Sequence, residues 1–146
     1  MKATSVSKQF SCRVSSDCDC VQILQSMAEV FAARAGLDDI EANRVVLAVD
    51  ELFANIVRHG YAEMAGAVDV EAAIISSDSD MELRFSFRDY AEPVAKLEDL
   101  KGRDLDKVCP GGLGLHLIRM VMDEVTHEVL PDGNRWMLIR RVALQE

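Results

Sequence analysis

The chain lacks a long hydrophobic run and lacks a surplus of basic residues. No apolar stretch reaches the roughly 20 residues that cross a bilayer, and the first residues lack the apolar core of a signal peptide. Lys and Arg total 16 against 25 Asp and Glu, a formal net charge of −9. Without excess positive charge to neutralise phosphates, we expect no direct nucleic-acid binding, and the net negative charge favours partners with basic surfaces. From the missing apolar segments we expect no membrane association and a cytoplasmic location.

The cysteines lack the companions that a structural metal site needs. Cys18 and Cys20 are separated by one residue, but no second Cys or His pair stands at zinc-site spacing. The other two thiols are Cys12 and Cys109. In a reducing compartment we expect reduced, partly buried thiols rather than disulfides or zinc ligands.

The chain also lacks internal repeats and linkers, which favours a single domain over residues 1–146. Five segments alternate or are rich in strand formers, which predicts strands. They are residues 10–14, 68–74, 81–89, 125–130 and 135–142. Three segments have apolar residues at spacings of three and four, which predicts helices. They are residues 16–35, capped by Ser16 or Asp17 and closed by Gly36; 38–59, begun by Asp38 or Asp39 and ended by Gly60; and 113–122.

The predicted order, β-α-α-β-β-loop-α-β-β, does not alternate strands and helices strictly, which excludes a doubly wound parallel sheet. We therefore predict an α/β (α+β) two-layer sandwich. Its mixed, mostly antiparallel sheet has helices on one face.

Two polar side chains, Glu51 and Asn55, lie one turn apart on the second predicted helix. At about 100° per residue they fall nearly opposite its apolar stripe. An ordinary solvated face is the simpler interpretation. The otherwise apolar helix, its end at Gly60, and the acid and glycines that follow favour a functional site.

Asp89 shares the parity of the apolar residues in the strand over residues 81–89. It either points into the buried face, where an ionised carboxylate needs a partner, or lies where the strand becomes exposed. Position alone does not separate these two interpretations. A ligand with an exocyclic amine, such as adenine, would supply a matching donor.

Gly111, Gly112 and Gly114 lead directly into the last predicted helix. Glycines let backbone N–H groups approach a phosphate, and a helix N-terminus favours negative charge, although a simple tight turn is the alternative. No Lys-Ser or Lys-Thr follows and no strand immediately precedes, which excludes a Walker loop and a Rossmann loop.

Together these residues describe a nucleotide site. Asn55 offers an amide oxygen to Mg²⁺, and Glu51 can accept a proton from an attacking hydroxyl. Asp89 would read adenine, while Gly112 and Gly114 would hold phosphates.

Three ordered motifs resemble those of the GHKL, or histidine kinase-like, ATPases. Glu51-x-x-x-Asn55 with His59-Gly60-Tyr61 resembles the N box, and Arg88-Asp89-Tyr90-Ala91 resembles the adenine-binding Asp-x-Gly box. The run from Gly111 to Ile118 resembles the second glycine box. Within that superfamily the chain resembles the anti-sigma-factor serine/threonine kinases of the RsbW and SpoIIAB type, over nearly its whole length.

The resemblance implies a Bergerat ATP-binding fold with an ATP lid over residues 92–110 and Mg-ATP or Mg-ADP as ligand. It implies Glu51 as the catalytic base and Asn55 as the Mg²⁺ ligand. It also implies nucleotide binding by a set of residues along the three motifs. These are Asn55, Asp89, Ala91, Gly112, Leu113 and Gly114.

The implied function is phosphorylation of a STAS-domain anti-anti-sigma protein and sequestration of a sigma factor, and we expect a homodimer. Ala91 stands at the glycine position of its box, and Pro110 stands where many relatives have a basic residue. Both departures bear on nucleotide affinity and phosphotransfer. The alternatives are a nucleotide-dependent binding module that holds a sigma factor or regulator with little or no kinase activity, and, more distantly, a purely structural domain.

Overall fold

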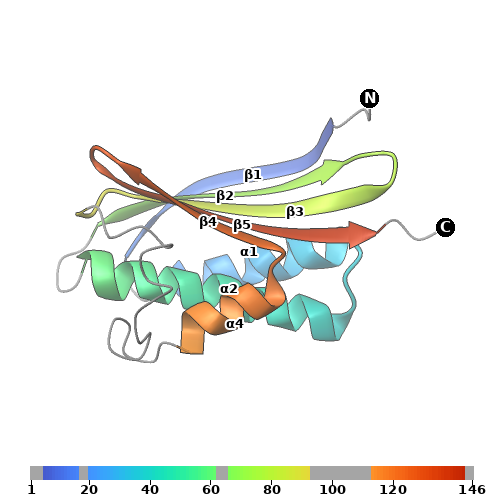
Figure 1. Ribbon diagram of the computed structural model, residues 1–146, viewed down its shortest axis with the longest axis horizontal. Helices are drawn as coiled ribbons and strands as arrows, with labels where there is room; N and C mark the ends of the chain where they lie inside the picture. Colours follow the sequence, from blue (N-terminus) through green and yellow to red (C-terminus); the bar gives the residue numbers. More distant parts are fainter. Residues whose placement is uncertain (1–4, 17–19, 62–65, 93–112, 144–146) are drawn as a thin grey trace.

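The computed structural model describes residues 5–16, 20–61, 66–92 and 113–143; at positions 113 and 114 it describes the backbone alone. In these residues five strands form one sheet of order β1-β2-β3-β5-β4, and the helices cover one of its faces (Figure 1). The strands are β1 (Ser5–Ser15), β2 (Ala67–Ser76), β3 (Asp80–Asp89), β4 (Glu124–Leu130) and β5 (Gly133–Ala143). The helices are α1 (Val21–Arg34), α2 (Asp39–Ile56), its π-helical continuation η2 (Val57–Tyr61) and α4 (Leu113–Val121).

This arrangement confirms the predicted two-layer α/β sandwich. All four strand pairs are antiparallel, so the sheet is simpler than the mixed one we expected. No helix among the described residues has the length and apolar character that a bilayer crossing requires.

The inner face of the sheet is set by the alternation that the sequence shows most clearly in β3. Leu83, Phe85 and Phe87 have no exposed surface, and Phe85 pairs with Leu138 of β5 in the antiparallel register. Removing side chains of this size from water contributes roughly 1.5–3 kcal/mol each. The same register places Asp89 opposite Asn134 and beside Val68 of β2, so the last residue of β3 also faces the helices.

Helix α2 is the central element of the helical layer. Asp38 caps its N-terminus, since its carboxylate accepts a hydrogen bond of 2.8 Å from the Glu41 N–H. Its apolar stripe packs against the sheet and is fully or almost fully buried. The stripe consists of Val45, Val49, Leu52, Phe53 and Ile56.

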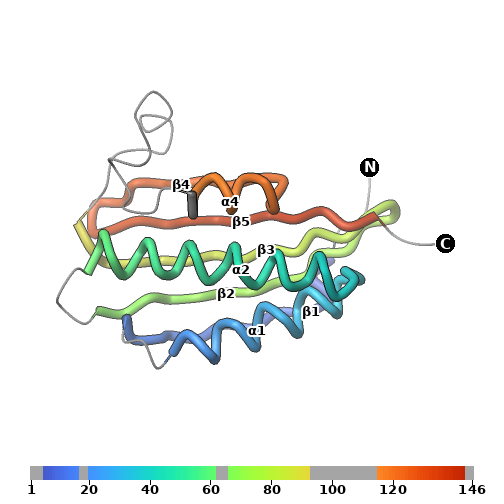
Figure 2. The backbone as a smooth tube through the Cα atoms, turned by 90° about the horizontal axis from the view of Figure 1, so that it is seen from below, coloured from blue at the N-terminus to red at the C-terminus, as the bar shows by residue number. Residues whose placement is uncertain are grey.

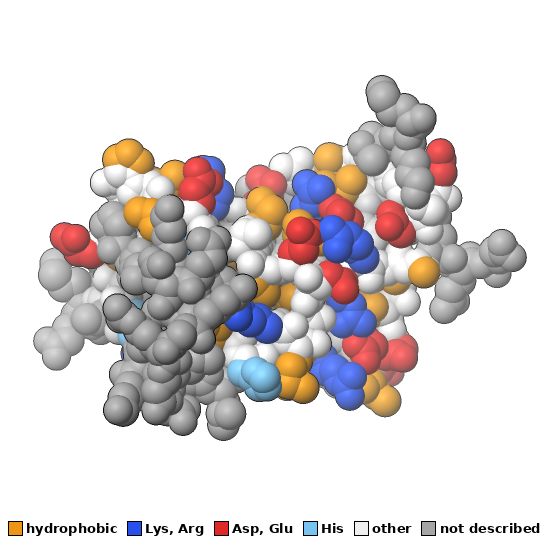
Figure 3. All heavy atoms as spheres, viewed as in Figure 1, with side chains coloured by type: hydrophobic (Ala, Val, Ile, Leu, Met, Phe, Trp, Pro, Cys, Tyr) orange, Lys and Arg blue, Asp and Glu red, His pale blue; other side chains and the backbone are white. Residues whose placement is uncertain are grey.

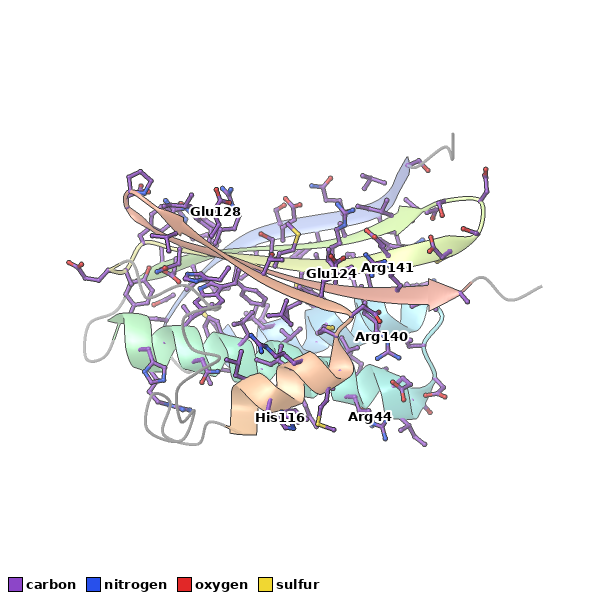
Figure 4. All side chains as sticks on the ribbon, in the orientation of Figure 1. Arg44, His116, Glu124, Glu128, Arg140 and Arg141 are labelled. Carbon is purple, nitrogen blue, oxygen red and sulfur yellow. The ribbon has the colours of Figure 1, made fainter. Side chains whose placement is uncertain are left out.

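Arg140 of β5 connects the sheet to α2 and α4. Its guanidinium donates to the main-chain oxygen of Val121 at 2.8 Å and to the Glu41 carboxylate at 2.8 Å. Figure 4 shows Arg140 between β5 and the helices, while His116 of α4 and Arg44 of α2 point away from the sheet. The sheet strand thus holds α2 and α4 at fixed positions relative to each other.

Acidic and basic side chains are interspersed over the face formed by β4, β5 and α4 (Figure 3). On this face Arg141 pairs with Glu124. Such exposed pairs contribute little stability, because solvent screens the charges.

Several predicted boundaries were wrong. Helix α1 begins at Val21 rather than at a cap formed by Ser16 or Asp17, and Cys20 precedes it without a side-chain cap. Strand β1 begins five residues earlier than expected, at Ser5, because pairing with β2 orders a segment that carries no alternating pattern. Gly36 does close α1, with a φ of 99° that favours glycine.

The predicted end of α2 at a left-handed Gly60 was also wrong. The chain continues as the π-helical turn η2, and Gly60 is not among the glycines with positive φ in the described residues. A π-helical turn inside or after an α-helix often marks a functional site.

Three segments meet at one end of the molecule: the C-terminal end of α2, the end of β3, and the turn between β4 and β5 (Figure 2). The β2–β3 turn and the C-terminus lie at the opposite end (Figure 1). The predicted N box and Asp-x-Gly box, far apart in sequence, therefore lie at the same end of the fold.

Candidate functional site

Glu51 and Asn55 project from one flank of α2, each half-buried. Ala48, which shares their sector of the helix, is completely buried, so this flank borders packed protein. The exposed back of α2 is instead occupied by Ile40 and Leu47. The two polar residues are therefore at the side of the stripe rather than opposite it, and α2 packs against α4.

Toward the other described residues, the side chains of Glu51 and Asn55 form neither hydrogen bonds nor ion pairs. A half-buried carboxylate and amide with free acceptor oxygens on the same flank are suited to receive a proton and a hard cation. This donor set fits the Mg²⁺ that the resemblance implies. Mg²⁺ sites commonly use one or two protein oxygens beside phosphate and water, so Asn55 alone is an adequate side-chain ligand.

The π-helical turn η2 connects this flank to the end of β3. Gly60 lies directly against Ala91, and a Cβ built at Gly60 would be 3.0 Å from the Ala91 Cβ. Ala91 is buried, and its methyl group is accommodated because Gly60 has no side chain. The substitution of alanine at the glycine position of the Asp-x-Gly box is thus matched by a glycine on the helix.

Tyr61 adds a second connection at the same place. Its hydroxyl donates to the Ala67 carbonyl at 2.6 Å and accepts from the Tyr90 N–H at 2.7 Å. Burial raises the pKa of the Tyr61 phenol, so it keeps its proton at neutral pH and can donate. The end of the N box is therefore fixed to the start of β2 and to the residue after Asp89.

His59 lies on the same turn. Burial and the neighbouring Arg58 guanidinium lower the pKa of its imidazole, so the ring is neutral at pH 7.

Asp89 is 2% exposed, which decides between the two interpretations of its position in favour of burial. Its Oδ1 accepts hydrogen bonds from Asn134 Nδ2 at 2.9 Å and from the Ala91 N–H at 3.2 Å. Its Oδ2 accepts from Trp136 Nε1 at 3.2 Å. A carboxylate has about four acceptor positions, so one on Oδ2 remains for a ligand. This geometry suits a base that presents an N–H donor.

Gly133 permits the close approach of β3 and β5 that brings Asn134 to Asp89. Its φ of 152° lies in the region that favours glycine, and a Cβ there would collide with the Asp89 carbonyl and the Arg88 side chain. The turn between β4 and β5 is at Pro131 and Asp132, so β5 begins at Gly133, two residues earlier than the strand predicted over residues 135–142.

The phosphate side of the predicted site lies mostly outside the described residues. Gly112, Pro110 and the proposed lid beyond Glu92 all lie outside the described residues. Leu113 and Gly114 form the first turn of α4, as expected for a glycine box that opens a helix.

Sequence reasoning missed Gly133, Asn134 and Trp136 as residues of the site. Their proximity to Asp89 depends on the β3–β5 register, which no local pattern reveals.

Comparison with known proteins relates the chain to one family. Residues 14–139 match the model of the histidine kinase-like ATPase domain. The chain is 30% identical over 123 residues to the serine-protein kinase RsbW of Staphylococcus aureus. The aligned region covers 78% of this chain and 75% of that protein.

Solved structures agree on the fold. The RsbU and RsbW domains of a Mycobacterium tuberculosis protein match with a TM-score of 0.64 at 17% identity, over 95% of this chain and 34% of that one. The histidine kinase domain of a blue-light-activated histidine kinase from Erythrobacter litoralis matches with a TM-score of 0.53 at 16% identity, over 82% of this chain and 59% of that one. The SiaB–SiaC complex of Pseudomonas aeruginosa matches with a TM-score of 0.51 at 15% identity, over 94% of this chain and 91% of that one.

Proposed function

Because the chain belongs to the histidine kinase-like ATPase family, we propose that it is an anti-sigma regulatory factor with serine/threonine kinase activity. It binds Mg-ATP and phosphorylates a STAS-domain anti-anti-sigma protein in a partner-switching system. Its 30% identity to a protein named as a serine-protein kinase supports this choice among the activities of the family.

The observation that carries the proposal is the joining of the two motifs at one end of the fold. The helix with Glu51 and Asn55 continues into η2, and Gly60 of that turn contacts Ala91 beside the buried Asp89. Asp89, which we propose accepts a hydrogen bond from adenine, is thereby held in a fixed arrangement with Glu51 and Asn55, which we propose accept the proton and bind Mg²⁺. Such positioning is most of what phosphoryl transfer requires of a protein.

In the proposed reaction a serine or threonine oxygen of the partner protein attacks the γ-phosphorus of ATP. The bond from that phosphorus to the β–γ bridging oxygen breaks, ADP leaves, and the hydroxyl proton passes to the Glu51 carboxylate. Asp89 accepts a hydrogen bond from the adenine amine and orients the nucleotide. Asn55 holds Mg²⁺, which when bound neutralises phosphate charge.

The proposed protein partners follow from the same relationship. We infer that the chain also binds a sigma factor and works as a homodimer. Light scattering tests the assembly, since a monomer mass across a wide concentration range would exclude the dimer.

The decisive experiment is transfer of labelled γ-phosphate from ATP to a STAS-domain protein encoded beside this gene. The wild type should label it, and Asn55→Ala should lose both nucleotide binding and transfer. Asn43→Ala is the matched control, because Asn43 is exposed on the same helix. Titration with Mg-ADP provides a second arm, in which Asp89→Asn should weaken binding by about 1–3 kcal/mol.

The transfer arm separates the proposed kinase from its rival, and the titration arm tests the role of Asp89. A wild type that binds Mg-ATP but labels no co-encoded partner would favour the binding module that holds a regulator without phosphorylating it. Unchanged ADP affinity in Asp89→Asn would remove Asp89 from the nucleotide site.

A further inference from the structure

The β4–β5 hairpin places two side chains against Asp89 and a third side chain behind those two. Asn134 and Trp136 of β5 donate to its two carboxylate oxygens at 2.9 and 3.2 Å. His127 of β4 stacks on Trp136 with ring centroids 3.9 Å apart and an interplanar angle of 16°. Its Nε2 lies 2.9 Å from Asn134 Oδ1. The hairpin therefore forms one connected network behind the carboxylate.

The hydrogen bonds of Asn134 fix the orientation of its amide. Nδ2 donates to Asp89 and also to the Glu92 carbonyl at 3.3 Å. Oδ1 must then accept, so His127 donates from Nε2. The stack on Trp136 holds the His127 ring in place, although its Nδ1 is buried without a hydrogen-bond partner among the described residues. His127 thus prevents the amide from turning its oxygen toward Asp89.

We propose that Asn134, backed by His127, is a positioning residue that makes Asp89 selective for a 6-aminopurine over a 6-oxopurine. This inference rests on the proposed function, because it concerns the base end of the same nucleotide site. It assigns to the hairpin a role in base selection, exerted through the carboxylate.

The selectivity follows from the donor and acceptor pattern. An ionised carboxylate can only accept. With two donors on Oδ1 and one on Oδ2, the position that remains for a ligand is on Oδ2, and its direction is set by the donors that hold the carboxylate. The exocyclic amine of adenine is a donor, whereas the corresponding oxygen of hypoxanthine is an acceptor and faces an unfavourable contact. If Asn134 no longer holds Oδ1, the carboxylate can rotate and the discrimination weakens.

The test is calorimetric titration of Mg-ADP and Mg-IDP into the wild type and variants of Asn134. Asn134→Ala should weaken ADP binding about tenfold or more, since hydrogen bonds to charged groups contribute more than one power of ten. IDP binding should change less than about twofold, so the ADP-to-IDP ratio collapses. Asn134→Ser retains an O–H donor and should restore part of the ratio. Arg135→Ala, an exposed neighbour on the same strand, is the matched control.

Trp136 gives a readout that needs no nucleotide. It is the one tryptophan of the chain, so intrinsic fluorescence reports its environment alone. Asn134→Ala and His127→Phe should both shift its emission in the ligand-free protein, while Arg135→Ala should not. Far-ultraviolet circular dichroism establishes that each variant is folded. If the alanine variant is unstable, Asn134→Asp takes its place, because it is close to isosteric and replaces the donor by an acceptor.

The outcomes are distinct from those for the proposed function. A wild type that binds neither nucleotide would overturn the proposed function, and this inference with it. A wild type that binds ADP, beside a folded Asn134→Ala with the same affinity and the same ADP-to-IDP ratio, would overturn this inference alone.

Discussion

The two halves of the candidate site are built in opposite ways. At the end of β3, Asp89 is buried and receives three hydrogen bonds from the protein. On the flank of α2, Glu51 and Asn55 are half-buried and have no side-chain partner among the described residues. We call the surroundings of Asp89 the built half, because the protein itself supplies the hydrogen-bond donors there. We call the flank with Glu51 and Asn55 the open half, because the described residues supply no partner for these two side chains.

The difference reflects what each half does in the proposed reaction. A buried carboxylate that reads a base is costly unless donors surround it, and those donors also fix its direction. A proton acceptor and a metal ligand must keep their lone pairs for the substrate and the ion. Substitution of Glu51 should therefore change the rate of the chemistry without changing nucleotide affinity, whereas Asn55→Ala removes the metal ligand and should impair both. Substitutions around Asp89 should change stability and nucleotide affinity.

Glu51→Gln is the sharpest test of that division. The amide keeps the shape of the side chain but cannot accept the hydroxyl proton, so transfer to the partner should fall about 10²–10⁴-fold. ADP affinity should stay within about twofold, because Glu51 is not at the base end. Single-turnover transfer and calorimetry measure the two quantities. Wild-type transfer in Glu51→Gln would show that the proton acceptor is another group.

Gly133→Ala should produce the largest loss of stability at the built half. The new Cβ meets the Asp89 carbonyl and the backbone has a φ of 152°, so we expect a loss of about 2–3 kcal/mol and weaker ADP binding. Gly36→Ala is the matched control. It shares the positive φ, but its Cβ would meet Val142 at an ordinary 3.9 Å. Urea unfolding compares the free energies of unfolding of the two variants. Equal losses would mean that the strain of a positive φ, without the collision at Asp89, destabilises Gly133→Ala.

Much of this organisation could be predicted from local patterns. The alternation over residues 81–89 gave the strand and the inward parity of Asp89, and the spacing along α2 gave the buried stripe. The parts that failed depend on tertiary pairing. Asn134 reads as a turn residue until the β3–β5 register sets it opposite Asp89.

The π-helical turn was missed for a related reason. Gly60 at the end of an apolar helix is typical of a left-handed C′ position. Its actual environment is set by a contact with Ala91, some thirty residues later in the chain, which no periodicity reveals. The helix start was misplaced as well, because Ser16 forms hydrogen bonds with Gly66 instead of capping α1.

A double-mutant cycle between Gly60 and Ala91 tests the connection between the two halves. Gly60→Ala alone should cost about 1 kcal/mol, because the two Cβ atoms would be 3.0 Å apart. In the Ala91→Gly background the same change should be neutral or stabilising, since alanine is the better helix former. Urea unfolding of the four proteins gives the coupling, for which we expect about 1 kcal/mol. A coupling near zero would mean that the turn and the Asp-x-Gly box adjust independently.

The smallest expected effect concerns a carboxylate that has donors but lies near the surface. Asp69 of β2 accepts from Arg13 Nε at 2.6 Å and Nη2 at 3.0 Å, and Tyr90 also donates to it. The Arg13 hydrogen bond holds the pKa of Asp69 below its usual value, against the opposing effect of burial. Because the folded-state pKa is the lower one, this stabilisation is present above the unfolded-state pKa and is lost as pH falls through the folded-state value.

Asp69→Asn should therefore cost a few tenths of a kcal/mol at pH 7, the usual contribution of an exposed pair, and the difference from wild type should shrink below about pH 4. Urea unfolding across that range measures it, with ADP titration beside it at pH 7. Asp69 has its donors on the outer face of the sheet, where solvent competes for them, and Asp89 has its donors in the core. If Asp69→Asn weakened ADP binding as much as Asp89→Asn, hydrogen bonding alone would determine a carboxylate's importance here. We expect unchanged ADP affinity, because we assign Asp89 to the proposed nucleotide site on its burial where α2 and β3 meet, rather than on the number of its donors.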